Sequence, residues 1–279
     1  MIKKIIKNIL NKNLSPQKVN NLFLIWLLFK RLFKNKKNRS IMDVFNKKKY
    51  FLMMNSEIVF SIRDLGNSTI SRGKNFFSKE KETIQWIDSF SKKSNFVDIG
   101  ANIGIFSLYA AFKGHNIISI EPESLNFAVL NINIYDNQFQ KNIKSFPFSI
   151  SLKNNIGFLK LSEIAWGKSN HQFNHKEQND NSYLQGSYGC SADYLFEKIN
   201  FIPDYIKIDV DGNELLVIQG MENTLKSGSI KSILIEINLS DQRNQEIFKI
   251  FSKYNYNITF SKAVYESQPN IVNYIYEKN

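Results

Sequence analysis

The sequence predicts a doubly wound α/β fold with a mostly parallel sheet, preceded by a basic helical segment. Short apolar runs alternate with helical patterns from residue 95 onward, a glycine-rich turn joins the first of these runs to a helix, and acidic residues follow several of the predicted strands. Since 43% of the 279 residues are hydrophobic, we expect one α/β domain over residues 50–279 and a separate segment over residues 1–49.

Positive charge is concentrated in segment 1–49. It holds 14 Lys/Arg and one acid, Asp43, and so carries +13, whereas residues 50–279 hold 23 Lys/Arg and 24 Asp/Glu and carry −1, which together give the net charge of +12. A nearly neutral domain argues against a nucleic-acid-binding surface there. The single cysteine, Cys190, excludes an internal disulfide framework and suits a reducing, cytoplasmic compartment.

Two interpretations of residues 1–39 remain open. The apolar run 22–29 is shorter than the roughly 20 residues of a spanning helix, and no signal-peptide cleavage site is visible. One interpretation is a basic amphipathic helix on an anionic membrane surface, which would place the protein peripherally at the inner membrane face. The other is a helix that packs its apolar stripe on the domain or on a second copy. A nucleic-acid-binding arm is less favoured.

Residues 50–65 predict a hairpin that flanks the main sheet, with its turn at residues 55–56. Ser78 is a candidate N-cap for a helix through Phe90, in which Ile84, Ile87 and Phe90 follow helical spacing. We therefore expect a helix over residues 78–90 immediately before the first core strand.

The stretch NFVDIGANIG, residues 95–104, organises the domain. A short apolar run, Phe96 to Ile99, predicts a buried strand that carries Asp98 near its end, and a helical pattern follows from Ile105 to Phe112. A strand, a glycine turn and a helix N-terminus in this order are typical of a nucleotide-cofactor site.

Individual residues of this turn and of the next strand have separate expected roles. Gly100 allows a sharp turn, Ala101 lets a cofactor approach the backbone, and Gly104 lets the helix pack closely on the strand. The next predicted strand, residues 116–120, ends in Glu121, whose carboxylate can accept hydrogen bonds from both ribose hydroxyls.

The remaining elements continue the alternation of strands and helices. His115 is expected to be solvated in a turn. Further helices are expected at 124–136 (capped by Ser124), 192–200, 214–225 and 241–254, and strands at 143–150, 156–161, 205–208, 230–237, 256–260 and 271–276. The short connection between the last two strands predicts that they add an antiparallel strand to the sheet.

The segment 162–189 is polar and aperiodic, which predicts a flexible loop or a substrate lid carrying Trp166 and Tyr183. It contains His171 and His175 at i, i+4 spacing, with Cys190 beyond it. A zinc site needs more ligands at closer spacing, so no metal ligands are assigned here.

Acidic residues are expected to converge at one edge of the sheet. Asp98, Glu121, Asp209 and Glu236 fall at or near predicted strand ends, and ligands of open α/β sheets bind outside the carboxyl ends of the strands. Two other acids, Glu123 and Asp204, are instead expected to cap a helix or to pair with surface lysines.

Four stretches carry a resemblance to a known family. They are VDIGANIGIFSLYA from Val97, SIEPE from Ser119, YIKIDVDGNELLVIQG from Tyr205 and ILIEIN from Ile233. Together they resemble the FkbM-type, S-adenosylmethionine-dependent methyltransferases of class I over roughly residues 95–240. That family usually has Glu where this chain has Asp211. The resemblance implies a Rossmann-like, seven-stranded sheet and O-methylation of a hydroxyl on a sugar, glycan or natural product.

The resemblance also assigns cofactor-binding residues. It implies that Asp98 and Gly100 lie by the methionine moiety, that Ala101, Asn102 and Gly104 form a backbone cradle, and that Glu121 holds the ribose. Carboxylates suit a cofactor whose sulfur is positively charged.

Catalytic residues are expected after the strand 205–208. Asp209 is the first candidate for the general base that removes the proton of an alcohol. Lys207, which alternates with apolar neighbours in that strand, and Glu236 are the other catalytic candidates, although Lys207 could instead pair with Asp211 or Glu214. Glu236 and Asn238 could orient the acceptor or, with Asp209, hold Mg²⁺, which prefers oxygen ligands.

Two other classes of function compete with a methyltransferase. A nicotinamide oxidoreductase would share the crevice and the ribose carboxylate, but its G-x-G-x-x-G pattern is missing its middle glycine, replaced by Asn102. A non-catalytic scaffold on the same fold, docked to membranes through residues 1–39, is the second alternative.

Overall fold

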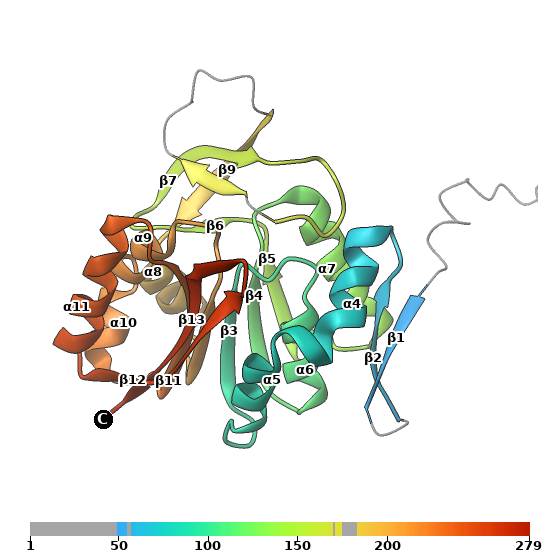
Figure 1. Cartoon of the computed structure of the whole chain (residues 1–279), viewed down its shortest axis with the longest axis horizontal. Coiled ribbons are helices and arrows are strands. Elements are labelled where there is room, and N and C mark those ends of the chain that lie inside the picture. Colours follow the sequence, from blue (N-terminus) through green and yellow to red (C-terminus); the bar gives the residue numbers. More distant parts are fainter. Residues whose placement is uncertain (1–48, 55–56, 170, 175–182) are drawn as a thin grey trace, which may run out of the picture. The chain divides into compact units, whose positions relative to one another are not determined.

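The computed structural model describes residues 49–54, 57–169, 171–174 and 183–279. Within them, the core is a seven-stranded sheet in the order β12-β13-β11-β10-β3-β4-β5 (Figure 1). Its strands are β3 (Asn95–Ile99), β4 (Asn116–Ile120), β5 (Ile143–Phe146), β10 (Tyr205–Ile208), β11 (Ser232–Asn238), β12 (Tyr256–Tyr265) and β13 (Gln268–Lys278). Strand β13 is antiparallel to both its neighbours, and the five strands from β11 to β5 are parallel. The predicted mostly parallel α/β sheet is confirmed.

Helices cover both faces of this sheet. They are α4 (Asn67–Lys79), α5 (Lys81–Asp88), α6 (Ile105–Phe112), α7 (Ser124–Asp136), α8 (Ala192–Ile199), α9 (Glu214–Gln219), α10 (Glu222–Ser227), the short 3-10 helix η1 (Gln242–Asn244) and α11 (Gln245–Lys253). Neighbouring strand residues alternate between two apolar cores: Phe96 packs with α4 to α7, and Val97 with α8 to α11. Both side chains are fully buried, which explains why the strands read as continuous apolar runs.

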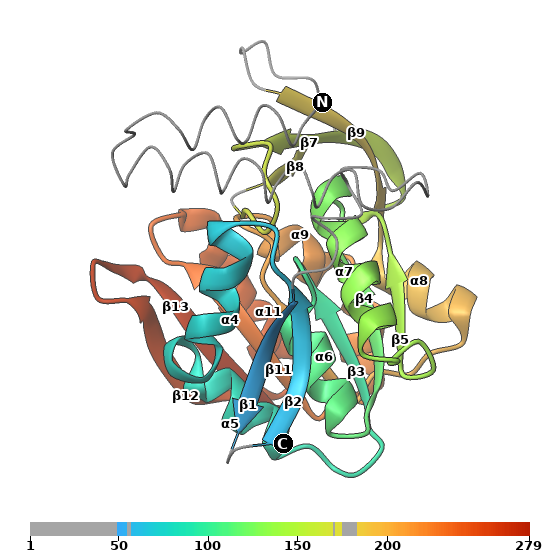
Figure 2. The same ribbon diagram turned by 90° about the vertical axis from the view of Figure 1, so that its right-hand side faces the viewer.

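A second, four-stranded sheet lies at the carboxyl end of the main sheet (Figure 2). It comprises β6 (Ser149–Ile150), β7 (Asn155–Leu161), β8 (Gln172–Asn174) and β9 (Tyr183–Cys190). The loop predicted over 162–189 is therefore wrong for residues 172–174 and 183–189, which are strands, whereas residues 162–169 contain no helix or strand. The strand predicted over 143–150 is two strands in different sheets. Glycines hide this sheet from sequence patterns: a Cβ on Gly189 would lie 2.6 Å from the Phe173 ring, so packing requires a residue that reads as a strand breaker.

The helix predicted over 78–90 is also wrong. Helix α4 ends at Lys79 and α5 begins at Lys81, and Ser78 lies within α4, where its hydroxyl donates to the Asn75 carbonyl. Helix 214–225 is likewise two helices, since α9 ends at Gln219 and α10 begins at Glu222. Between them the chain passes so close to Ser151 that a Cβ on Gly220 would lie 2.0 Å from the Ser151 carbonyl oxygen.

His115 is buried rather than solvated. Its side chain is 3% exposed, and its Nδ1 accepts a hydrogen bond from the Ser94 amide. Burial lowers the pKa of His115, which keeps the ring neutral. The residue therefore belongs to the packing of the turn after α6.

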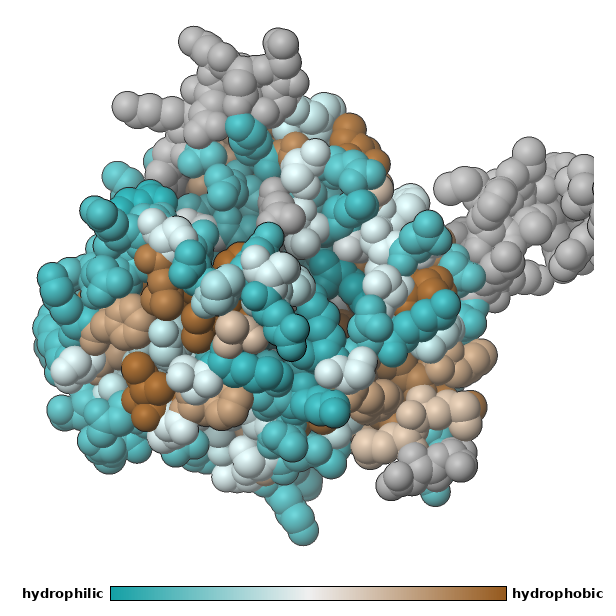
Figure 3. Space-filling model, in the orientation of Figure 1, coloured by the Kyte–Doolittle hydropathy of each residue, from teal (hydrophilic) through white to brown (hydrophobic). Residues whose placement is uncertain are grey.

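The predicted hairpin forms a separate two-stranded sheet, β1 (Lys49–Met54) and β2 (Glu57–Arg63). It is attached to α7: the Arg63 guanidinium lies 2.5 Å from the Asp136 carboxylate. Its other face is apolar and exposed, as the brown surface over these strands shows (Figure 3). The side chains of Phe51, Met53 and Ile58 on it are more than half exposed.

The expected segment 1–49 lies outside the described residues except for Lys49, so the interpretations of residues 1–39 stay predictions. Across the part of the chain that the structure describes, no helix is long and apolar enough to cross a membrane.

Glu123, rather than Ser124, is the N-cap of α7. Its carboxylate accepts hydrogen bonds from the amides of Leu125 and Asn126, which confirms the capping role expected for Glu123.

We expect Glu123→Ala to lower the free energy of unfolding by about 1 kcal/mol, since two buried amides lose their acceptor. Urea unfolding of both proteins measures this. An unchanged midpoint and slope would contradict the capping role.

Candidate active site

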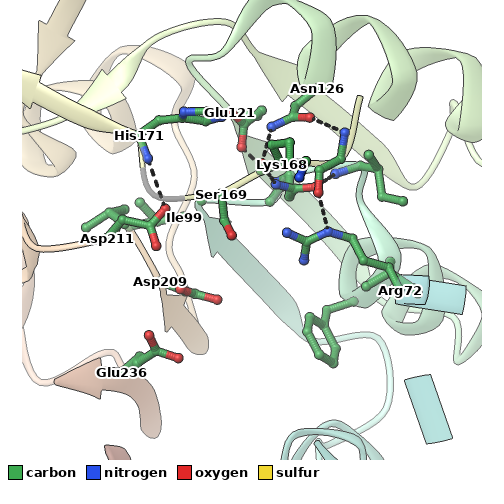
Figure 4. A pocket seen from close by; sticks show the side chains of 18 of the residues that line it. Arg72, Ile99, Glu121, Asn126, Lys168, Ser169, His171, Asp209, Asp211 and Glu236 are labelled. Carbon is green, nitrogen blue, oxygen red and sulfur yellow. Dashed lines mark hydrogen bonds between the residues drawn. The ribbon is translucent and has the colours of Figure 1, made fainter. Parts of the chain in front are cut away.

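A cavity of about 840 Å³ lies at the carboxyl ends of β3, β4, β10 and β11 (Figure 4). The small sheet, α4 and the connection between β12 and β13 contribute its other walls. Predicted site residues that line it are Gly100, Ala101, Asn102, Glu121, Lys207, Asp209 and Glu236. Asp98, Gly104 and Asn238 do not line it. The expected convergence of strand-end acids thus holds for Glu121, Asp209 and Glu236.

The glycine turn is shaped by close backbone contacts. Gly100 has φ +84°, and a Cβ there would lie 1.8 Å from the Asp209 carbonyl oxygen. Asn102 has φ 52°, a left-handed conformation that asparagine tolerates, and its side chain accepts from the Ile103 amide and donates to the Lys168 carbonyl. The missing middle glycine is therefore replaced by a residue that can adopt the same backbone.

Glu121 is held in place by the backbone. Its Oε2 accepts from the Asn102 amide at 2.8 Å and its Oε1 accepts from the Glu123 amide at 2.9 Å. Burial raises the pKa of Glu121 to about 8, although these two hydrogen bonds oppose the shift. The carboxyl group is thus oriented toward the cavity with one lone pair of each oxygen already used.

Asp98 lies beneath the turn. It is 1% exposed, and its Oδ2 accepts from the Ser107 hydroxyl of α6 at 2.6 Å, which in turn accepts from Ser119 of β4. Burial raises the pKa of Asp98, opposed by the positive charge of Lys207. In this structure the hydrogen bond between Asp98 and Ser107 links α6 to the sheet.

Lys207 and Asp209 form an ion pair at the end of β10. Lys207 Nζ lies 2.8 Å from Asp209 Oδ2, so the pairing of Lys207 is with Asp209 and not with Asp211 or Glu214. The Lys207 side chain is 3% exposed, whereas that of Asp209 is 34% exposed and faces the cavity. Burial works to lower the pKa of Lys207, but Asp209 and other nearby carboxylates raise it above its ordinary value.

The pKa values of Asp209 and Glu236 are shifted in opposite directions. Burial works to raise the pKa of Asp209, but the charge of Lys207 lowers it. Burial, followed by repulsion from Asp209, raises the pKa of Glu236 to about 9. At neutral pH the cavity therefore presents an ionised Asp209 beside a protonated Glu236, a separation of pKa values that is typical of acid–base sites.

Several lining residues were not predicted from the sequence: Arg72, Lys79, Glu80, Asn126, Lys168, His171 and Tyr265. Asn126 holds the loop above the cavity, accepting from the Gly167 amide and donating to the Lys168 carbonyl. The residues of α4 do carry a helical signal, since Ser68, Ser71, Arg72, Asn75 and Lys79 stand at i, i+3, i+4, i+7 and i+11, but such a polar face is also what an exposed helix surface shows.

A metal centre finds no support. Among the described residues, no three His, Cys, Asp or Glu side chains are grouped so as to hold a metal ion. Asn238, expected as a possible Mg²⁺ ligand, accepts a hydrogen bond from the Ser240 amide outside the cavity. Cys190 is a free, buried thiol, and His175 lies outside the described residues.

Strand order, the inserted antiparallel strand and the glycine turn beside a strand-end carboxylate together define a class I methyltransferase fold. Residues 98–258 match the family model described as the methyltransferase FkbM domain. The chain belongs to this family and is a methyltransferase.

Solved structures with a similar fold have low sequence identity to this chain. Methyltransferase FkbM from Methylobacillus flagellatus KT is 18% identical, with a TM-score of 0.47, and the match covers 67% of this chain but only 44% of that one. Precorrin-6y C5,15-methyltransferase from Geobacter metallireducens GS-15 is 12% identical, with a TM-score of 0.45 and coverage of 72% and 90%. A comparison with curated protein sequences finds no match.

Proposed function

We propose that the protein transfers a methyl group from S-adenosylmethionine to a hydroxyl group of a sugar, glycan or natural product. The observation that carries this proposal is the ionised, cavity-facing Asp209 beside a protonated Glu236, in the same cavity as the backbone-held Glu121. Such an arrangement offers a base for the acceptor and a ribose-binding carboxylate within one cavity.

The residues present fit this cofactor. A cavity of about 840 Å³ is large enough for a ligand of this size, and Glu121 stands at the strand end where α/β folds bind ribose hydroxyls. Gly100, Ala101 and Asn102 bring backbone to the cavity wall beside it. S-adenosylmethionine, when bound, supplies a methyl group activated by a positively charged sulfur, which the cavity carboxylates favour.

The chain's own residues then prepare the acceptor. Asp209 Oδ2 is occupied by Lys207, so Oδ1 accepts the proton of the acceptor hydroxyl. Lys207 holds the carboxylate in one orientation, and its positive charge stabilises the negative charge that develops on the acceptor oxygen. Protonated Glu236 donates a hydrogen bond that orients the acceptor.

Affinity for S-adenosylmethionine is expected to rise with pH. Glu121 must be ionised to accept both ribose hydroxyls, and its pKa is raised to about 8. The affinity should therefore increase from pH 6 toward 8, by at most about tenfold per pH unit, and level off above that. Calorimetric titrations at several pH values measure this, and they should detect proton release on binding at pH 7. An affinity that falls as pH rises would contradict the role of Glu121.

Binding of S-adenosylmethionine, S-adenosylhomocysteine and NAD to the full chain tests the cofactor assignment. We expect one equivalent of either adenosyl compound to bind and NAD not to bind, in calorimetry with each ligand. Binding of NAD without binding of S-adenosylmethionine would overturn the proposal in favour of an oxidoreductase.

A further inference from the structure

Helix α4 presents a polar face to the cavity. Ser68, Ser71, Arg72 and Asn75 line the cavity at helical spacing, and the buried Phe76, one turn after Arg72, packs in the core and also borders the cavity. Helix α4 packs beside α6, the helix that follows the glycine turn. The contact is made by Phe76, whose ring centroid lies 5.5 Å from that of Phe106. This face therefore forms a fixed polar wall.

Arg72 is distinctive among the cations of this cavity. Four cationic side chains of the described residues line it, and the other three have their end groups engaged: Lys207 with Asp209 at 2.8 Å, Lys168 with Glu163 at 2.7 Å, and Lys79 with the Tyr265 hydroxyl at 2.8 Å. Arg72 uses only Nε, which donates to the Gly167 carbonyl at 2.9 Å. Its two terminal Nη groups donate to no described residue, and so a bidentate donor remains available.

Arg72 lies near both functional parts of the cavity, Glu121 and Asp209. Figure 4 shows its side chain extending from α4 toward the cavity. Its positive charge contributes to the lowered pKa of Asp209 and opposes the rise that burial causes in the pKa of Glu121, so it lies within electrostatic reach of the ribose-binding carboxylate and of the base. An anion bound by Arg72 would therefore lie near both of these residues.

The chemistry of the cofactor identifies this anion. The sulfur of S-adenosylmethionine carries three groups: adenosyl, methyl and an amino acid chain that ends in a carboxylate. On the proposed function, Glu121 takes the adenosyl group and the methyl group faces Asp209, so the amino acid chain is left for another part of the polar lining. Of that lining, α4 is the part that carries a cation with unengaged donors. Resting on that function, we propose that Arg72 binds the carboxylate of the methionine moiety.

The test compares S-adenosylmethionine with decarboxylated S-adenosylmethionine, which keeps the adenosyl group, the charged sulfur and the amine. Calorimetry would measure both affinities for the full wild-type chain, for Arg72→Gln and Arg72→Lys, and for the control Lys74→Gln, whose residue is exposed on the same helix outside the cavity. We expect Arg72→Gln to weaken binding of S-adenosylmethionine by about 10- to 100-fold and of the decarboxylated compound only slightly. Arg72→Lys should fall between, and Lys74→Gln should match wild type.

Three results would overturn the inference. Equal weakening for both compounds in Arg72→Gln would assign Arg72 a structural role through Gly167. Unchanged binding of both, with a raised KM for the acceptor, would assign it to the acceptor. Equal affinity of the wild-type chain for both compounds would show that no residue reads the carboxylate. A wild-type chain that binds neither compound would instead contradict the proposed function.

Discussion

The substitution Asp209→Asn is expected to lower kcat by about 100-fold or more while the affinity for S-adenosylmethionine changes little. The amide keeps a hydrogen-bond acceptor for Lys207 Nζ, which lies 2.8 Å from Asp209 Oδ2, so the geometry at the end of β10 is retained. It cannot accept the proton of the acceptor hydroxyl. Initial rates at saturating cofactor, together with calorimetric cofactor binding, separate these two effects.

A matched control lies at the other end of the same strand. Asp204 immediately precedes β10 and pairs with Lys231 at 2.9 Å, outside the cavity. Asp204→Asn should leave kcat within a few-fold of wild type, since its ion pair is partly exposed and contributes little. Wild-type turnover in Asp209→Asn, or an equal loss in both variants, would remove Asp209 as the base.

The substitution Gly100→Ala is expected to be among the most destabilising in the chain. The added Cβ would lie 1.8 Å from the Asp209 carbonyl oxygen, and φ +84° is unfavourable for alanine. Because the obstacle is backbone at the end of β10, relief requires the two strands to separate at the site. We expect a loss of about 4 kcal/mol or more in the free energy of unfolding, and loss of cofactor binding.

The substitution Gly114→Ala measures the cost of a left-handed backbone conformation without a steric clash. Gly114 has φ +88° but nothing within 4 Å of an added Cβ, so only the cost of the left-handed conformation applies, about 1–2 kcal/mol. Denaturant unfolding of both variants therefore measures the steric cost at Gly100 by difference. Equal losses in the two variants would contradict the close approach of Gly100 to β10.

The main sheet could be predicted because its residues repeat a simple pattern. The runs at Phe96–Ile99 and Tyr205–Ile208 are buried on both faces, and each is followed by residues suited to the carboxyl edge. Parallel topology then brings Glu121, Asp209 and Glu236 to one cavity without any knowledge of side-chain contacts.

The rest depends on contacts that a sequence does not display. The polar face of α4 hid the helix, because its cavity-facing residues look like a surface. The small sheet was hidden by glycines that make room for Phe173. The partner of Lys207 was expected to be Asp211 or Glu214, and this prediction was wrong, because the course of the backbone after β10 brings Asp209 to Lys207.

The most direct test of the account is methyl transfer from labelled S-adenosylmethionine to a panel of hydroxyl-bearing glycans by the full chain, beside Asp209→Asn and Asp204→Asn. We expect label to appear in an alkali-stable ether on an acceptor, with stoichiometric S-adenosylhomocysteine, for the wild type and for Asp204→Asn but not for Asp209→Asn. Tight cofactor binding without transfer to any acceptor, or transfer that is unaffected in Asp209→Asn, would contradict it.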